Sequence, residues 1–101
     1  MKIDVYMSEG GARMVLNGRF DFNSHREFRN SYDTVLADSA VQKFDVDLGG
    51  VDYLDSAALG MLLLLRERGV AANKQVALCN CHGMVAQVLE VANFNKLFTM
   101  K

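Results

Sequence analysis

Residues 44–60, FDVDLGGVDYLDSAALG, decide the fold of this 101-residue chain. The first five alternate apolar with acidic side chains, the period-two pattern of a half-buried strand, and Gly49-Gly50 are expected to end that strand. Further on, Asp55 or Ser56 is a suitable N-cap, because a short side chain with an oxygen accepts hydrogen bonds from the free N–H groups of a helix start. The segment therefore predicts a strand that leads into a helix.

That helix is expected over residues 56–69, with arginines in its last turn and a glycine at its end. At 100° per residue, two apolar clusters can face a core, and they consist of Leu59, Leu62 and Leu63 and of Ala58, Met61 and Leu65. The remaining stripe has the spacing i, i+4, i+7, i+11 and consists of Ser56, Gly60, Leu63 and Glu67, with Leu64 on its flank. We expect this stripe to face solvent or a partner.

Upstream, residues 3–7 and 12–16 alternate around a break at residues 8–11, which predicts a hairpin, and Asn17-Gly18 is expected to end its second strand as a turn. Ser24 and Glu27 form a capping-box pattern before an amphipathic helix over residues 24–37. Downstream, residues 75–78 predict a strand and residues 84–92 a third helix. This order is typical of an α/β fold, a mixed sheet of about four to five strands packed with about three to four helices.

Length and composition restrict the class of protein. A chain of 101 residues that is 50% hydrophobic and 23% charged suits one globular domain, which we expect to occupy residues 1–101. A formal net charge of −1 without a basic stripe argues against nucleic acid as a partner. The longest apolar run is far shorter than the roughly 20 residues that span a bilayer, and the N-terminus has no signal-peptide pattern. We therefore expect a cytoplasmic protein without direct membrane insertion.

Catalysis and metal binding are not indicated. A hydrolase elbow would place glycines at Leu54 and Ala58, and nothing in the sequence directs either histidine, His25 or His82, toward Ser56. Cys79 and Cys81 are near neighbours in an extended segment and lack the further ligands that a zinc site needs. The sequence predicts no catalytic residue, no metal site and no cofactor.

Two interpretations of Ser56 remain open from the residues alone. The serine could be a helix cap and nothing more, or it could begin a docking stripe whose glycine lets another backbone approach and whose leucines stand where a surface helix normally carries charge. A helix buried on all sides would show the same pattern. A phosphate is tolerated at a helix N-terminus, so its addition to Ser56 would change the surface charge without unfolding the domain.

The segment from Phe44 to Gly60 resembles the signature of STAS domains of the anti-sigma factor antagonist family, in which a strand leads into Asp-Ser-[Ser/Thr/Ala]-Gly-Leu-Gly. The match here is Asp55-Ser56-Ala57-Ala58-Leu59-Gly60, and the segment from Leu16 to Asp21 is similar to the Gly-x-Leu-Asp step of the family. The resemblance implies a stand-alone STAS protein whose unphosphorylated form binds a serine kinase of the GHKL ATPase type, often an anti-sigma factor. Phosphorylation ends that contact, and a PP2C-type phosphatase restores it.

Carried over by position, the resemblance makes Ser56 the phosphate acceptor and assigns partner binding to a set of neighbouring residues. That set is Asp21, Asp55, Ala57, Ala58, Gly60, Leu63, Leu64 and Glu67. Ala58 departs from the family pattern, which has glycine there. The output could be a sigma factor, secretion, surface polysaccharide or biofilm control. The alternative is a STAS subunit that holds a larger assembly together without phosphorylation, such as an ABC transporter for lipids.

Overall fold

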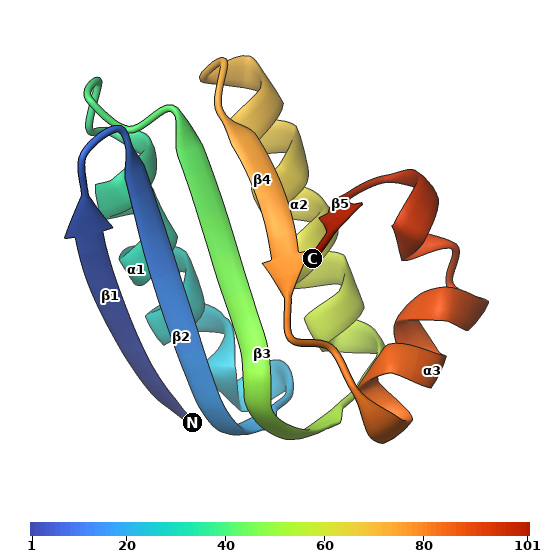
Figure 1. Ribbon diagram of the computed structural model, residues 1–101. Coiled ribbons are helices and arrows are strands. Elements are labelled where there is room, and N and C mark those ends of the chain that lie inside the picture. Colours follow the sequence, from blue (N-terminus) through green and yellow to red (C-terminus); the bar gives the residue numbers. More distant parts are fainter.

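The strands form one mixed sheet in the order β1-β2-β3-β4-β5 in the computed structural model, which describes all 101 residues (Figure 1). β1 is antiparallel to β2, and every other neighbouring pair is parallel. The strands are β1 (Lys2–Ser8), β2 (Gly11–Phe20), β3 (Lys43–Leu54), β4 (Gln75–Cys79) and β5 (Thr99–Met100). The predicted mixed α/β sheet is therefore confirmed.

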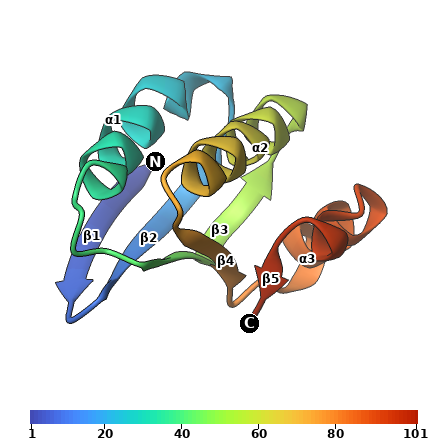
Figure 2. The same ribbon diagram turned by 90° about the horizontal axis from the view of Figure 1, so that it is seen from above.

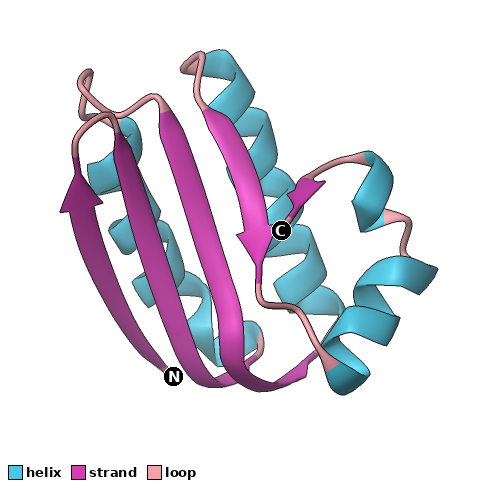
Figure 3. Ribbon diagram, in the orientation of Figure 1, coloured by secondary structure: helices cyan, strands magenta, loops and turns pink.

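Two helices cover one face of this sheet. Figure 2 shows α1 (His25–Leu36) and α2 (Ser56–Ala71) side by side on the same face, while α3 (Gly83–Val91) lies beyond them next to β5. Short 3-10 helices, η1 (Phe22–Ser24) and η2 (Phe94–Lys96), complete the fold (Figure 3). None of the helices has the length and apolar character that crossing a membrane requires.

The core lies between the sheet and the α1–α2 layer. Alternate residues of β2 and β3 point into it, as the period-two pattern predicts. From the strands it takes Met14, Leu16, Phe44, Val46 and Leu48, and from the helices Phe28, Tyr32, Val35, Leu62 and Leu65. Phe20, Phe28 and Tyr32 make consecutive aromatic contacts, with ring centroids 4.9 and 5.3 Å apart. This packing fixes both helices on the sheet.

The other face of the sheet is polar. Arg13 lies 3.7 Å from a carboxylate oxygen of Asp45 and 3.4 Å from one of Asp47, and Lys101 lies 3.1 Å from Asp45. Partly exposed ion pairs of this kind add little stability each. These paired charges lie on the face of the sheet opposite to α1 and α2.

The glycines did not end the strands as predicted. β3 continues through Gly49-Gly50 to Leu54, and β2 continues through Asn17-Gly18 to Phe20. The two strands pair along their whole length and absorb the irregularity as register shifts between Val15 and Asn17 and between Gly18 and Arg19. Continuous pairing with a neighbour therefore outweighed the local preference of glycine for a turn.

Ser24 directly precedes the first helix, as predicted, but its side chain makes no capping hydrogen bond to α1. The capping box forms one turn earlier, around η1, where the Asp21 carboxylate accepts from the backbone N–H of Asn23 at 3.0 Å and the Ser24 hydroxyl oxygen accepts from the backbone N–H of Asp21 at 3.4 Å. α1 itself begins at His25, one residue later than predicted. The capping residue lies earlier because a 3-10 turn precedes the helix, which the helical period alone does not indicate.

Lys74 ties together two loops at the end of the sheet where β3 and β4 begin. Its ammonium donates to the backbone carbonyls of Asp38 at 2.8 Å and Val41 at 2.7 Å, and the residue is 8% exposed. Replacing Lys74 with methionine removes both donors and leaves the buried carbonyl of Val41 without a hydrogen bond, whereas the carbonyl of Asp38 still accepts one from the backbone N–H of Val41 at 3.1 Å.

We expect Lys74→Met to lower the free energy of unfolding by about 2–3 kcal/mol, which is roughly 8–24 °C in Tm for a domain of this size. Thermal unfolding followed by circular dichroism measures the change. Lys96→Met, at an exposed lysine of η2, is the control and should leave Tm nearly unchanged. Equal Tm values for the two variants would show that the Lys74 contacts contribute nothing.

Candidate functional site

The strand-to-helix junction places a carboxylate and a hydroxyl side by side. β3 ends at Leu54, and Asp55 stays extended before α2 begins at Ser56. The Asp55 carboxylate accepts a hydrogen bond from the backbone N–H of Ala58 at 2.9 Å, which makes Asp55 the N-cap of α2. Because the aspartate performs the capping, the helix does not depend on the hydroxyl of Ser56.

Ser56 is the first residue of α2 and is exposed. The first N–H groups of a helix have no partners within it, and its dipole favours negative charge. An anion attached to the Ser56 oxygen would therefore meet a favourable helix terminus on one side and the Asp55 carboxylate on the other. Ser56 is open to solvent rather than enclosed in a buried pocket, so the site suits a group that is added and removed at the surface.

A second carboxylate reaches the same edge of the sheet. Phe20 and Leu54 are partners in the parallel β2–β3 register, so Asp21 and Asp55 are the next residues along two neighbouring strands. Asp21 is held in place by the Arg19 guanidinium at 3.0 Å and the backbone N–H of Asn23 at 3.0 Å. The end of β2 and the end of β3 thus each place a carboxylate at the edge where α2 begins, and the one of Asp21 is paired with Arg19.

The predicted stripe on α2 faces outward. Ser56, Gly60, Leu63 and Glu67 are all exposed, and Leu63 retains 36% of its accessible surface. A Cβ added at Gly60 would meet nothing within 4 Å, so the helix backbone is open to close approach there. An exposed helix face with a glycine and a leucine at its centre suits contact with another protein.

The flanking residues of the stripe differ in their exposure. Ala57 and Leu64 are half-buried and retain some surface. Ala58, predicted to contact a partner, is fully buried at 0% exposure, so that prediction is wrong. Its methyl group points into the core on the same side as Met61 and Leu65, because residues three and seven positions apart share a helix face.

Sequence reasoning missed three residues near this edge. Phe22 is 72% exposed directly after Asp21, and the Arg19 guanidinium lies 3.8 Å from the centre of the Tyr53 ring. An aromatic residue inside the polar turn of residues 21–25 is the one signal that could have identified Phe22. The Arg19–Tyr53 contact depends on the register shift before Arg19, which the sequence does not show.

A shallow apolar groove continues the exposed surface of α2 onto α3. It is lined by Leu59 of α2 and by Gln87, Val88, Val91 and Ala92 of α3 or its end. Val91, the last residue of α3, is 84% exposed and extends the apolar lining of this groove. Because Leu59 and the stripe residue Leu63 are four positions apart and share a helix face, a partner that covers the stripe can extend onto α3.

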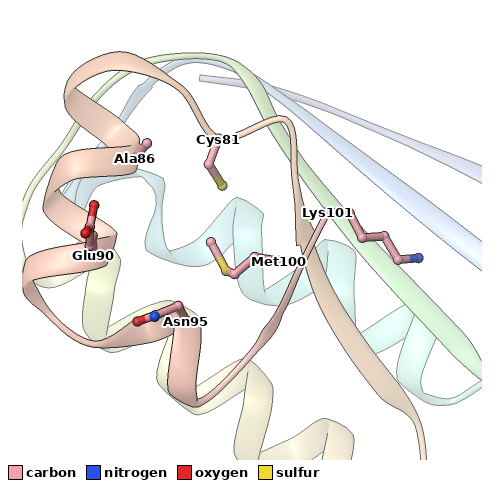
Figure 4. Close-up of a pocket in the computed structure, with 6 residues that line it drawn as sticks. All are labelled: Cys81, Ala86, Glu90, Asn95, Met100 and Lys101. Atoms are coloured by element: carbon pink, nitrogen blue, oxygen red, sulfur yellow. The ribbon is translucent and has the colours of Figure 1, made fainter.

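A second hollow lies on the other side of α3 and contains a thiol. Figure 4 shows Cys81 and Met100 pointing toward one another across it, with Glu90 and Asn95 at its edge. Both cysteines are free, and burial raises the pKa of Cys81 to about 11, with Cys79 and Asp47 adding to the effect. Burial, then Asp45, also raises the pKa of Cys79. The thiols are therefore protonated near neutral pH and poor nucleophiles.

The two histidines do not assemble with Ser56 into a catalytic group. The His82 ring nitrogen lies 2.8 Å from the backbone carbonyl oxygen of Gly49. This contact holds the His82 side chain against β3 at the start of α3. His25 is exposed at the first position of α1. A nucleophilic serine needs a base within hydrogen-bond reach, and no such pair is formed here.

A protein-family model described as "Mlab, STAS domain" matches residues 3–99. A "STAS-domain containing protein" of Pseudomonas aeruginosa strain UCBPP-PA14 is 41% identical over 100 residues, and the match covers 97% of each chain. The motif that leads into α2 and the α2 stripe both lie inside these matches. The sequence relationship thus extends over nearly the whole chain.

Solved structures agree on the fold. A putative anti-sigma factor antagonist from Thermotoga maritima has a TM-score of 0.86 at 17% identity, covering 97% of this chain and 84% of that one. The anti-sigma factor antagonist SpoIIAA in its unphosphorylated form has a TM-score of 0.76 at 17% identity, covering 99% and 87%. SpoIIAA in its phosphorylated form has a TM-score of 0.76 at 16% identity, covering 99% and 91%.

Proposed function

The chain belongs to the STAS domain family, and from that premise we propose that it is a regulatory binding protein whose partner contact is ended by phosphorylation of Ser56. One observation carries the proposal. Ser56 is exposed at the first position of α2, and it is the first residue of the exposed stripe that continues with Gly60, Leu63 and Glu67. Its hydroxyl is not needed to cap the helix, because Asp55 does so. Modification at this residue changes the docking face itself.

The charges around Ser56 explain how a phosphate would act. A phosphoserine adds about −1.5 to −2 charges at pH 7. Asp55 already places a carboxylate next to Ser56, while Asp21 at the same edge is paired with Arg19, so the added phosphate is repelled mainly by Asp55 and extends its charge over the exposed surface. A partner seated on Gly60 and Leu63 would then have to desolvate a dianion or meet it with its own charge. Loss of a few kcal/mol is enough to end a micromolar contact.

The proposed partners are those that the family resemblance implies. The proposed binding partner is a serine kinase of the GHKL ATPase type that also serves as an anti-sigma factor or similar regulator, and a PP2C-type phosphatase removes the phosphate. ATP and its metal ion belong to the kinase. The fold of SpoIIAA, an anti-sigma factor antagonist solved with and without phosphate, supports this arrangement.

Transfer of radiolabelled phosphate tests the acceptor. The chain is incubated with ATP labelled at the γ position and a soluble extract of its source cells, and incorporation is compared between variants. We expect Ser56→Ala to abolish labelling and Ser39→Ala to retain it, because Ser39 is an exposed serine in the loop that precedes β3, at the opposite end of that strand. Equal labelling of the two variants would exclude Ser56 as the acceptor.

A second function is favoured by the apolar groove. A STAS subunit of a larger assembly, such as a lipid ABC transporter, would need permanent cover for the groove lined by Leu59, Val88, Val91 and Ala92. The strong exposure of Val91 fits such a contact. The two functions differ in their response to charge: a constitutive complex centred on the groove would persist when Ser56 is replaced by aspartate.

A further inference from the structure

β1 is an edge strand with one free side. It pairs with β2 through seven consecutive residues and begins the strand order of the sheet (Figure 1). Because hydrogen bonding alternates along an antiparallel ladder, alternate residues of β1 turn their N–H and C=O groups toward this open side. Soluble proteins usually protect such an edge with a bulge, a proline or charges along it. β1 has a regular ladder and the chain contains no proline. Its two charged residues, Lys2 and Asp4, lie toward its beginning and pair with each other at 3.9 Å, so residues 5–8 of the strand carry no charge.

The exposed side chains of this strand are mainly apolar. Val5, Tyr6 and Met7 retain 39%, 59% and 53% of their accessible surface. Val5 is the register partner of Met14 and Met7 of Ala12, and both partners are buried under the helical layer. Since residues opposite one another in an antiparallel pair share a face, Val5 and Met7 extend the core to the edge of the sheet.

We propose that the occupant of this edge is β1 of a second copy of the chain, paired antiparallel about a twofold axis at Val5. In this register Val5 faces Val5 of the second copy, and Ile3 faces Met7. On the polar face, Asp4 faces Tyr6 and Lys2 faces Ser8. Every residue of β1 finds a partner, Ile3, Val5 and Met7 oppose one another on the helical face, and no like charges lie opposite each other.

Other registers of the same strand are poorer. A twofold axis at Asp4 sets two carboxylates directly against each other, which is destabilising. A shift by one residue opposes apolar with polar side chains, because the side-chain period of a strand is two. An axis at Tyr6 leaves Lys2 and Ile3 without partners. The strand is therefore complementary to itself in one full-length register.

The proposed pairing joins two sheets into one and leaves α2 free in both copies. β1 and the β4–β5 side are opposite edges of the sheet, and Ser56 follows the central strand β3. A dimer of this kind presents two separate Ser56 stripes. The pairing does not depend on the proposed switch, so a monomeric chain would leave the Ser56 proposal intact.

A charge exchange at the twofold position tests the pairing. Sedimentation over a wide concentration series should give wild type a mass of twice the 11.2 kDa of one chain at high concentration. Val5→Lys and Val5→Glu should each abolish association, because like charges then oppose each other across the axis, whereas an equimolar mixture of the two should restore the dimer. Circular dichroism of each variant confirms that it is folded.

Three results would overturn the proposal: wild type that stays monomeric throughout, Val5→Lys that still dimerises, or a mixture that remains monomeric. If wild type is monomeric, the remaining candidate for pairing with β1 is an extended segment of a different protein. Amide hydrogen exchange on wild type needs no variant and provides the second measurement. Exchange at residues 3–7 should slow by at least about tenfold between dilute and concentrated samples, and unchanged rates would contradict the pairing.

Discussion

Replacement of Ser56 by aspartate is expected to lower the affinity of the chain for its regulatory partner by at least about tenfold, and phosphorylation of Ser56 by at least about a hundredfold. The physical reason is charge at the head of the docking stripe. Aspartate brings about half the charge of phosphoserine to a surface where a partner must lie against Gly60 and Leu63. Calorimetry with the purified partner measures both affinities.

The fold should survive this replacement. A carboxylate in the first turn of α2 gains from the helix dipole and loses from its neighbour Asp55, so Tm should move by no more than a few degrees. Ser39→Asp adds the same charge at a distant exposed loop and should bind like wild type. An unfolded Ser56→Asp variant, or one that binds as tightly as Ser39→Asp, would contradict the account of the site.

Arginine at Gly60 is expected to abolish partner binding while leaving the domain at least as stable as wild type. Gly60 is the one stripe position where a backbone can approach α2 directly, and an arginine side chain would fill that space. A Cβ at this position meets nothing within 4 Å, and arginine is a better helix former than glycine by about 0.5–1 kcal/mol. We therefore expect a loss in affinity of at least about thirtyfold together with a slightly raised Tm.

The matched control is Asn30→Arg, which adds the same side chain to the exposed surface of α1. It should bind the partner with wild-type affinity. Because Gly60→Arg is expected to stabilise the helix, weak binding by that variant cannot be attributed to unfolding. Wild-type affinity in Gly60→Arg would show that the partner does not sit on the stripe, and the α2–α3 groove would then be the remaining surface for docking.

Local patterns in the sequence were sufficient to predict the strands and the helix that carry the site. The alternation around residues 8–11 predicted the β1–β2 hairpin, and the change from period two to helical spacing after Leu54 predicted the β3–α2 junction. The helical wheel of α2 correctly grouped Ser56, Gly60, Leu63 and Glu67 on an exposed side, because a helix packed on a sheet has one side left for solvent. Its inclusion of Leu63 in a core-facing cluster was wrong, since Leu63 retains 36% of its accessible surface. These features depend on residues close together in the chain.

Features that depend on pairing between residues far apart in the chain could not be predicted from local sequence patterns. Gly49-Gly50 stays within β3 because β2 continues beside it, and the short β5 forms because Thr99 and Met100 meet Ala77 and Leu78 of β4. The exposure of Phe22 and the contact of Arg19 with Tyr53 likewise follow from the register of β2 and β3.

Ala58 shows where the family resemblance and the helix geometry disagreed. By position in the motif it was assigned to the partner surface, whereas its spacing from Met61 and Leu65 placed it on the core side. The structure follows the spacing, with Ala58 fully buried. Ala58 is two residues after Ser56 and is therefore turned by about 200° from it around the helix, so membership of the motif does not imply surface contact.

The most direct test of the central claim is intact-mass analysis of the protein from its native cells, with the modified residue mapped by fragmentation and each form used to capture partners. The account predicts a species heavier by the mass of one phosphate, located on Ser56, and a kinase-like partner held only by the unmodified form. A chain without phosphate in any growth condition, held in a constant complex that Ser56→Asp does not disturb, would contradict it.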